Sequence, residues 1–490
     1  MAQVLPFNGF YTGSDPKNSA RECVNYIPSR HDSGSLSEYT IKSTSGIKTA
    51  AGQITDANLE DTIVWNSNIT GVDAFGVIST ANSFLLAYES VNAIRTVSLL
   101  TLTGPEVALR ANVTYNSNII VVLCTTNQRQ VIISIDKDLN LLSSTDSTLS
   151  DEILDISYIG GRFLYATTGI TVYYSDILDP HTIDPLGFFS DLSQNSDNTG
   201  IYSDGNRLYL FSASSYSVWV NTPDVNLPFS MQKGSGLNIG LNAKTVLGDS
   251  LYFVGVNNGV TSLFRLSGGS VSDIGNEYIR NALSKNYLSF YLFRFYDNNS
   301  PIVCIGGDSS TTICYNELDG EFHERKSTNN TTGDYDRWSV FGSESIDSKR
   351  IVVFGKKPDS GDILISLVDR SISTEFGDPV KRTLITSPFN SNGVSNVVRE
   401  LAFQTSIDYS SESPVTLPSL DLSVSKDFGY NYGAVRSKQF DAEGKHDKIL
   451  RFMNIGFFRQ AFVFKIETDT IYPHSILKML IRLEKGFRQI

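Results

Sequence analysis

The sequence predicts an all-β protein in which a β-propeller of about six blades is followed by a terminal β-sandwich-like platform domain. A segment that reads as a turn entering an aromatic strand recurs at a nearly constant spacing. Aromatic residues are plentiful, with 23 Tyr and 28 Phe, and the strand-like runs are joined by turns of Gly, Asn, Asp and Ser. Both features are typical of short strands connected by tight turns.

The recurring segment occurs three times in the middle of the chain. Its copies are Gly160-Gly161-Arg162-Phe163-Leu164-Tyr165, Asp204-Gly205-Asn206-Arg207-Leu208-Tyr209-Leu210 and Gly248-Asp249-Ser250-Leu251-Tyr252-Phe253. Tyr165 and Tyr209 are 44 positions apart, and Tyr209 and Tyr252 are 43 positions apart. A period of roughly 40–45 residues is that of a propeller blade.

The same period can be extended in both directions along the chain. Backwards it lands near Val122 and then close to the strand-like run at Phe84, and forwards it lands near Phe293 and then near Trp338. The phase weakens at Trp338, so six blades are expected, with five or seven as the alternatives.

The elements follow in order. Residues 1–45 are polar and broken by turns such as Asp15-Pro16, and they are predicted to form an extended segment that joins the platform. Residues 46–384 are predicted to form the propeller, with strands paired by short Gly, Asn or Asp turns. The longest helix candidate, residues 276–283, has two turns at most. Residues 385–490 are predicted to form the platform, because apolar and polar positions alternate in four runs there. These runs are residues 419–424, 448–452, 461–467 and 475–483.

The charge is unevenly distributed. Residues 436–490 contain 11 Lys and Arg against 6 Asp and Glu, a net charge of +5. The whole chain has a net charge of −12, so residues 1–435 have a net charge of −17. An acidic protein of this kind is a poor candidate for a clamp on duplex DNA, which needs a basic surface. The basic end is typical either of a docking surface or of a solvated strand face.

The remaining composition excludes several classes of protein. The four cysteines, Cys23, Cys124, Cys304 and Cys314, form no CxxC pair, and they are expected to be free, mostly buried thiols in a reducing compartment. No signal peptide and no apolar run long enough to cross a membrane is recognised. The five histidines are widely separated, so no local zinc pair and no cofactor is expected.

Two motifs suggest chemistry, and each is better explained as a turn. Ser425-Lys426-Asp427-Phe428-Gly429-Tyr430-Asn431-Tyr432 fits the Asp-box pattern of sialidase propellers. In that pattern the carboxylate accepts backbone N–H bonds and Gly supplies a positive φ. Asp136-Lys137-Asp138-Leu139-Asn140 begins like a calcium loop but lacks the Gly and Glu that such a loop requires. No pair of carboxylates stands out as the acid and base of a glycosidase, so no catalytic residue is assigned.

The best candidates for a docking surface are the aromatic pair Phe457 and Phe458 with the neighbouring cations Arg459 and Arg451. Neighbouring residues of a strand face opposite sides, so one ring of the pair is expected in the core while the other is exposed. Aromatic residues and Arg are enriched at interfaces. The alternative is that both rings pack inside.

Ten segments, taken in order, resemble the packaged-DNA stabilisation proteins of short-tailed bacteriophages, which are the tail accessory factors that form the tail nozzle or hub. The similarity extends over most of the chain and is weakest over residues 295–400. Ser45 and Ser212 depart from the family pattern, since Pro and Gly are more usual at these positions. The segments are residues 18–28, 43–47, 151–165, 179–180, 184–188, 211–222, 227–229, 234–240, 425–433 and 451–464.

The resemblance implies a structural protein of the virion, assembled in the host bacterial cytoplasm. Proteins of this family form a hexamer below the portal and its adaptor ring, continue the DNA channel, and help to retain the packaged genome. They also offer attachment sites for a tail fibre or tailspike and for a needle or plug. Six copies of this chain would carry a charge of about −72, six times −12. Charge of this sign along the lumen would let double-stranded DNA pass without sequence-specific binding.

Two other functions are compatible with a propeller. The first is a carbohydrate-binding or glycosidase-type propeller, such as a depolymerase, for which release of reducing ends from a polysaccharide would be the evidence. The second is a scaffolding propeller within a cell. The predicted platform domain and the similarity of residues 451–464 to the family favour the phage protein.

Overall fold

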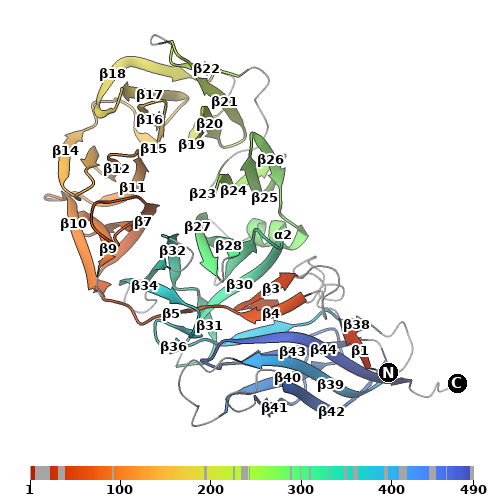
Figure 1. The fold of residues 1–490 in the computed structure, drawn as a ribbon. Coiled ribbons are helices and arrows are strands. Elements are labelled where there is room, and N and C mark those ends of the chain that lie inside the picture. Colours follow the sequence, from red (N-terminus) through yellow and green to blue (C-terminus); the bar gives the residue numbers. More distant parts are fainter. Residues whose placement is uncertain are drawn as a thin grey trace.

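A computed structural model of the chain shows a ring of blades with a second β unit attached to its rim (Figure 1). It describes residues 2–5, 22–30, 39–90, 93–192, 196–224, 227–232, 241, 243–286, 290–297, 300–307, 311–329, 331–346, 350–356, 362–390, 396–407, 417–440, 448–459 and 461–485. The segment 234–240, predicted above to belong to the family pattern, lies outside the described residues, as do residues 18–21.

Seven four-stranded antiparallel units surround the propeller axis within the described part of the chain. In each unit the first strand is innermost and its successors follow outwards. Blade one consists of β7 (Ala57–Val64), β8 (Ala74–Thr80), β9 (Ser83–Ser90) and β10 (Ala93–Thr101). Blade two consists of β11 (Ala108–Tyr115), β12 (Ile120–Thr126), β13 (Gln130–Ile135) and β14 (Leu141–Asp146). Blade three consists of β15 (Ile153–Ile159), β16 (Arg162–Thr167), β17 (Thr171–Asp176) and β18 (Asp179–Ser190). Blade four consists of β19 (Asn198–Asp204), β20 (Arg207–Ser212), β21 (Tyr216–Asn221) and β22 (Phe229–Met231). Blade five consists of β23 (Ala243–Leu247), β24 (Ser250–Asn257), β25 (Val260–Ser267) and β26 (Ser270–Asp273). Blade six consists of β27 (Phe290–Asp297), β28 (Ser300–Gly307), β29 (Thr312–Asn316) and β30 (Glu321–Thr328), and the short β31 (Tyr335–Arg337) pairs with β30.

The recurring segment is the turn between the first and second strands of blades three, four and five. Gly160, Gly205 and Gly248 adopt φ values of 60°, 57° and 57° in these turns, a conformation that favours Gly. The tyrosines that follow, Tyr165, Tyr209 and Tyr252, are fully buried between neighbouring blades. The propeller class is therefore confirmed by the feature that predicted it.

The expected blade count of six is corrected to seven. The helix α2 (Glu277–Asn286) lies between blades five and six, where the sequence predicted its longest helix, and lengthens that connection. The 43–44-residue period from Tyr252 therefore lands near Phe293 in the innermost strand β27 instead of in the second strand β28. At the next step it reaches Trp338, just before the first strand of blade seven. The insertion of α2 explains why the phase weakens before the last blade.

Blade seven is completed by the N-terminal part of the chain. Its own strands are β32 (Val340–Ser345), β33 (Ile351–Lys356) and β34 (Ile363–Asp369). The outer edge of β34 pairs with β6 (Gln53–Ile54) and β5 (Gly46–Ile47), which precede blade one in the sequence. Strands β35 (Thr374–Glu375) and β36 (Asp378–Pro379) continue this sheet beyond β5. The start of the propeller is thereby bonded to its last blade, which closes the ring.

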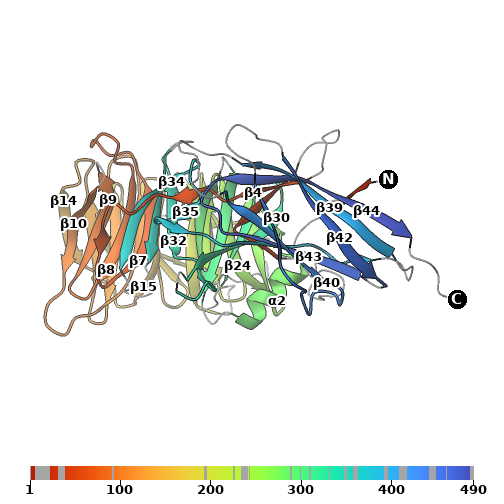
Figure 2. The ribbon, with the colours of Figure 1, turned by 90° about the horizontal axis from the view of Figure 1, so that it is seen from below.

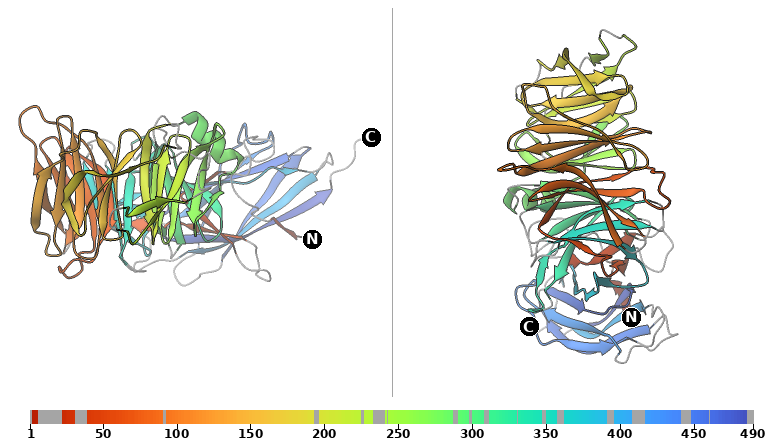
Figure 3. Two further views of the ribbon diagram at one scale, coloured as in Figure 1. Left: turned by 90° about the horizontal axis from the view of Figure 1, so that it is seen from above. Right: turned by 90° about the vertical axis from the view of Figure 1, so that its left-hand side faces the viewer.

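The platform extends from the rim of the ring in roughly the plane of the disc (Figure 2), and both chain termini lie at its far end (Figure 3). It contains two sheets. The first has the order β3 (Tyr26–Arg30), β4 (Tyr39–Ser43), β44 (His474–Lys485), β39 (Asn396–Ile407) and β42 (Lys448–Phe458), with β1 (Ala2–Leu5) also paired to β44. The second has the order β2 (Glu22–Val24), β37 (Arg382–Ile385), β43 (Ala461–Thr468), β40 (Ser419–Ser425) and β41 (Arg436–Gln439), with β38 (Phe389–Asn390) paired to β43.

The second platform sheet is continuous with blade six. Val24 of β2 pairs in parallel with Glu324 of β30, while β2 also pairs with β37 of the platform. One buried apolar cluster runs from Leu263 of blade five through Ile279 of α2 to Phe403 and Phe464 of the platform. Propeller and platform therefore share both a sheet and a core.

A buried ionic cluster fixes the N-terminal segment at this junction. The Asp297 carboxylate lies 3.2 Å from the Arg325 guanidinium and accepts hydrogen bonds from the Ser45 N–H (3.0 Å) and hydroxyl (2.5 Å). The Arg325 guanidinium also lies 4.5 Å from the centroid of the Trp338 ring. Ser45 thus supplies a backbone N–H donor and a hydroxyl donor, neither of which Pro could supply at this position.

Most of the innermost strands share a bulge. The register skips one residue near the start of five of them: β7, β11, β15, β19 and β32. In blade one, Asp61 follows the bulge and accepts hydrogen bonds from its neighbour Thr62 N–H (2.8 Å) and from Val113 N–H of blade two (3.2 Å). In blade three, Asp155 does the same toward Ile201 N–H of blade four (2.9 Å). Each of these two carboxylates therefore links its blade to the next one by a hydrogen bond.

The Asp61 carboxyl is predicted to make stability depend on pH. Burial, together with the nearby Glu344 and Asp155 charges, raises its pKa to about 7. The hydrogen bonds from the two backbone N–H groups lower the pKa but do not outweigh these effects. The folded state therefore retains a proton that the unfolded state releases near pH 3.8. The protonated Asp61 carboxyl therefore contributes to the free energy of unfolding in full below about pH 4. This contribution, on the order of a few kcal/mol, is lost as the pH rises to 7.

Asp61→Asn removes this titrating group and keeps one acceptor oxygen. Urea unfolding between pH 4 and 8 should show a flatter profile for the variant than for the parent chain. Parallel profiles for the two proteins would contradict the assignment.

Candidate functional site

The four predicted docking residues lie on or beside β42, the edge strand of the first platform sheet. Phe457 is 42% exposed, whereas Phe458 is 2% exposed and packs against Phe462 and Phe389, with ring centroids 4.2 and 6.2 Å away. The strand alternation predicted for this pair is therefore present: one ring anchors the core and the other faces outward.

Cations and apolar side chains share the exposed side of β42. The Arg459 guanidinium lies 5.9 Å from the centroid of the Phe457 ring, and Arg451 forms an ion pair with Glu400 on the neighbouring strand β39. Ile449 and Met453 are also exposed. We call Ile449, Arg451, Met453, Phe457 and Arg459 the β42 face. Its mixture of an aromatic ring, a methionine and arginines is the composition of an interface core.

The edge of this face is held by the opposite sheet. Arg436, from β41, donates to the carbonyl oxygens of Met453 (3.0 Å) and Asn454 (3.2 Å). Asn454 has a φ of 54°, and this left-handed residue turns the strand locally. Arg436 thereby fixes the irregular backbone beneath Met453, which keeps the β42 face in one shape.

The Asp-box segment next to this face is a structural turn, as predicted. The Asp427 carboxylate accepts hydrogen bonds from the Ser425 hydroxyl (2.6 Å), the Asn431 N–H (2.9 Å) and the Asn431 side-chain amide (2.7 Å). These bonds lower the pKa of the Asp427 carboxyl to about 2, and the bond from the Ser425 hydroxyl has the largest effect. Gly429 supplies a φ of 93°. A carboxylate that is held ionised by its own turn is not suited to donate a proton in catalysis.

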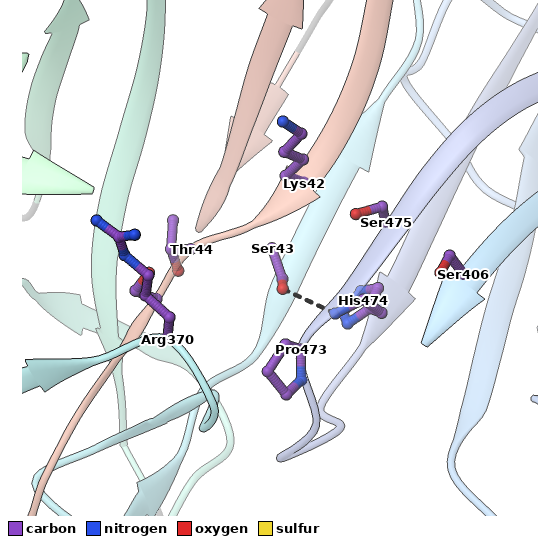
Figure 4. Close-up of a pocket in the computed structure, with 9 residues that line it drawn as sticks. Lys42, Ser43, Thr44, Arg370, Ser406, Pro473, His474 and Ser475 are labelled. Carbon is purple, nitrogen blue, oxygen red and sulfur yellow. Dashed lines mark hydrogen bonds between the residues drawn. The ribbon is translucent and has the colours of Figure 1, made fainter. Parts of the chain in front are cut away.

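A polar cavity of about 240 Å³ lies where the propeller meets the platform (Figure 4). Its lining includes Arg370, which follows β34 of blade seven, and Lys42 and Ser475 of the platform strands β4 and β44. The buried His474 also lines the cavity, and its backbone N–H donates a hydrogen bond to the Ser43 hydroxyl (2.9 Å). Burial and the Arg382 charge lower the pKa of His474 to about 3, so this ring is neutral at physiological pH.

The neutral His474 ring joins the N-terminal segment to the platform. Its Nδ1 lies 3.2 Å from the Tyr472 carbonyl oxygen, which can only accept a hydrogen bond, so Nδ1 carries the proton. Nε2 therefore accepts from the Tyr26 hydroxyl at 2.9 Å. This cavity is thus the rim of a structural contact between β3 and β44.

A larger cavity of about 540 Å³ lies beside blade seven. Its lining includes the acidic residues Glu375, Asp336 and Asp378. The buried Glu375 carboxylate already accepts hydrogen bonds from the hydroxyls of Ser327 (2.8 Å) and Ser339, and burial raises its pKa. These bonds place Glu375 in the packing of the blade.

The other chemical candidates are turns or core residues. Asp136 Oδ1 accepts from the backbone N–H groups of Asp138 (2.9 Å) and Asn140 (2.8 Å), which is the polar turn expected in place of a calcium loop. The four cysteines are buried and none of them forms a disulfide, as predicted. Among the described residues, no group of three or more His, Cys, Asp or Glu side chains is placed to hold a metal ion. No helix in the described part of the chain is long and apolar enough to cross a bilayer.

The comparison with sequence families agrees with this architecture. Residues 3–289, more than half of the chain, match the sequence family Phage_stabilise, described as "Bacteriophage P22 Gp10, beta-propeller". Two similar solved structures are the WD40 β-propeller domain of Doa1 and a chain of the mitotic checkpoint complex. The first has 12% identity and a TM-score of 0.36, covering 64% of this chain and 97% of that domain. The second has 11% identity and a TM-score of 0.41, covering 66% of this chain and 95% of that chain. No curated protein matches.

Three findings thus agree: the predicted order of family-like segments, the propeller of seven blades, and the family match over residues 3–289. The chain belongs to the phage-stabilisation family of β-propeller proteins, the family described by bacteriophage P22 Gp10.

Proposed function

We propose that this phage structural protein is the subunit of a tail nozzle or hub: a ring, most simply a hexamer, below the portal and its adaptor. In this proposal the ring continues the DNA channel and retains the packaged genome in the virion. It acts through shape and assembly and not through catalysis. The observation that carries the proposal is the match of residues 3–289 to the packaged-DNA stabilisation family.

The platform is proposed as the part that docks on the adaptor. Exposed Phe457, the Arg459 guanidinium over its ring, and the outward Arg451 lie together on the β42 face. Residues 436–490 carry a net charge of +5, which suits an acidic partner surface. Because the second platform sheet continues into blade six, a load on the platform is transmitted to the propeller through backbone hydrogen bonds.

The acidic body is proposed to face the DNA channel in part. Residues 1–435 carry −17 per copy, and repulsion of phosphate would let the genome slide past the ring without sticking. Tail fibres or tailspikes, and a needle or plug, are proposed as further partners of the ring.

Phe457→Glu is predicted to weaken assembly strongly. The substitution places a charge where we expect a desolvated aromatic contact, and central aromatic residues of interfaces typically contribute at least ~2 kcal/mol. The affinity of the full chain for the purified portal–adaptor complex, measured by co-sedimentation, should fall by a factor of about 30 or more. Arg459→Glu should act in the same direction.

Phe188→Glu is the matched control, because Phe188 is 47% exposed on the outer strand of blade three. It should bind like the parent, and all variants should keep the parental thermal midpoint. Equal binding by Phe457→Glu and Phe188→Glu would contradict the docking assignment. Release of reducing ends from host polysaccharide by the purified chain would instead favour the glycosidase-type alternative.

A further inference from the structure

Blade six contains a row of reactive side chains that no function above uses. Cys304 of β28 lies directly opposite Cys314 of β29, and Cys314 lies opposite His323 of β30. The two sulfur atoms are 3.5 Å apart. All three side chains are buried, with exposures of 0%, 1% and 0%. Three neighbouring strands thus align two thiols and an imidazole across one sheet.

The other two cysteines lack this arrangement. Cys23 donates its thiol hydrogen to the Tyr26 carbonyl oxygen at 3.4 Å, and Cys124 lies in the separate core between blades one and two. The Cys304–Cys314 pair belongs to the core between blades six and seven, beside Phe293 and Trp338. The chain therefore contains one close thiol pair and two built-in controls.

The two thiols are chemically unequal. Burial opposes ionisation of Cys314, but the hydrogen bond with Cys304 and the neighbouring His323 and Arg325 outweigh it and lower its pKa to about 6. Burial and the same hydrogen bond raise the pKa of Cys304 well above its usual value. Cys314 is accordingly the nucleophile of the pair, and Cys304 is the thiol that holds the shared proton.

We propose that Cys304 and Cys314 form a site of oxidative modification, which small peroxides convert into a cross-strand disulfide within blade six. Directly opposed residues of an antiparallel pair have Cα atoms about 4.5–5.5 Å apart, within the range of about 4.4–6.8 Å that a disulfide spans. Side-chain rotation must then bring the sulfur atoms from 3.5 Å to about 2 Å.

The reaction proceeds in two balanced steps. The Cys314 thiolate attacks one oxygen of hydrogen peroxide, the O–O bond breaks, and the leaving hydroxide takes up a proton to become water, which leaves a sulfenic acid on Cys314. The Cys304 sulfur then attacks the Cys314 sulfur, the S–O bond breaks, and the hydroxide leaves with the Cys304 proton as a second water. Two thiols and one peroxide give one disulfide and two waters; the sulfurs lose two electrons and the peroxide oxygens gain them.

The test treats the folded full chain with hydrogen peroxide, unfolds it in urea, alkylates the remaining thiols and maps the peptides. The expected result is that two of the four thiols disappear together and that a peptide joins Cys304 to Cys314, with recovery of all four thiols after dithiothreitol. Cys124→Ser and Cys23→Ser should form the same link. Cys304→Ser should form no link and should leave a sulfenic acid on Cys314 that dimedone labels.

Two outcomes would overturn the proposal. One is the loss of Cys23 or Cys124 at the same rate as the pair. The other is survival of all four thiols in the folded chain under a peroxide dose that oxidises the urea-unfolded chain. Because the parent and the Cys124→Ser and Cys23→Ser variants report on the same link, misfolding of Cys304→Ser would not obscure the result.

Discussion

Asp297→Ala is expected to lower the free energy of unfolding by about 3–5 kcal/mol, the typical effect of breaking a buried ion pair. Asp297 is fully buried and its partner Arg325 is nearly so. The substitution leaves the Arg325 cation without its counter-ion and the Ser45 N–H and hydroxyl without their acceptor. Urea unfolding of the parent and variant, followed by fluorescence, measures the difference.

Glu152→Ala provides the matched control for this prediction. Glu152 also pairs with an arginine, Arg110 at 2.7 Å, but both partners are substantially exposed, so the expected loss is below about 1 kcal/mol. The double variant Asp297→Leu with Arg325→Met removes both charges and should recover much of the stability lost by Asp297→Ala. Equal effects of Asp297→Ala and Glu152→Ala would show that the cluster does not hold the junction.

Deletion of residues 1–54 is expected to abolish the stable fold. The deletion removes β2, β3 and β4 from the platform sheets and β5 and β6 from the edge of blade seven. It also removes six fully or almost fully buried apolar side chains: Cys23, Val24, Tyr26, Ile27, Ile41 and Ile47. Burial of this many side chains contributes on the order of 10 kcal/mol, which is comparable with the whole stability of a typical domain. Size-exclusion chromatography should show aggregates, and trypsin should digest the product rapidly.

Deletion of residues 1–5 alone is the control for this truncation. It removes only β1, which pairs with β44 at four positions beside strands that stay in place. A soluble, monodisperse protein close to the parent in thermal midpoint is expected. A stable, protease-resistant propeller after deletion of residues 1–54 would contradict closure of the ring by the N-terminal segment.

Features encoded within a few residues were predictable from the sequence. The turns before Tyr165, Tyr209 and Tyr252 reveal the blades, because a Gly with positive φ and a buried aromatic ring are both local requirements. The Asp427 turn was recognised for the same reason. The opposite environments of Phe457 and Phe458 follow from strand alternation alone.

Features that depend on distant partners were not predictable. Ser45 and Asp297 are 252 positions apart, so nothing near either residue indicates their hydrogen bond. Ile54 pairs with Ile363, and the closing strand of blade seven therefore precedes blade one in the sequence. The blade count was low by one because α2 interrupts the period on which the count depended. The outward placement of Ile449 and Met453 beside the predicted docking residues required the register of β42 against β39.

The most direct measurement is a cryo-electron microscopy map of the tail assembled from this chain with its portal and adaptor. The proposal predicts six copies around a continuous DNA channel, each with seven blades closed by β6, and Phe457 and Arg459 of the β42 face buried against the adaptor. A map in which the β42 face lies in solvent while another surface contacts the adaptor, or in which the copies form no closed ring, would contradict it.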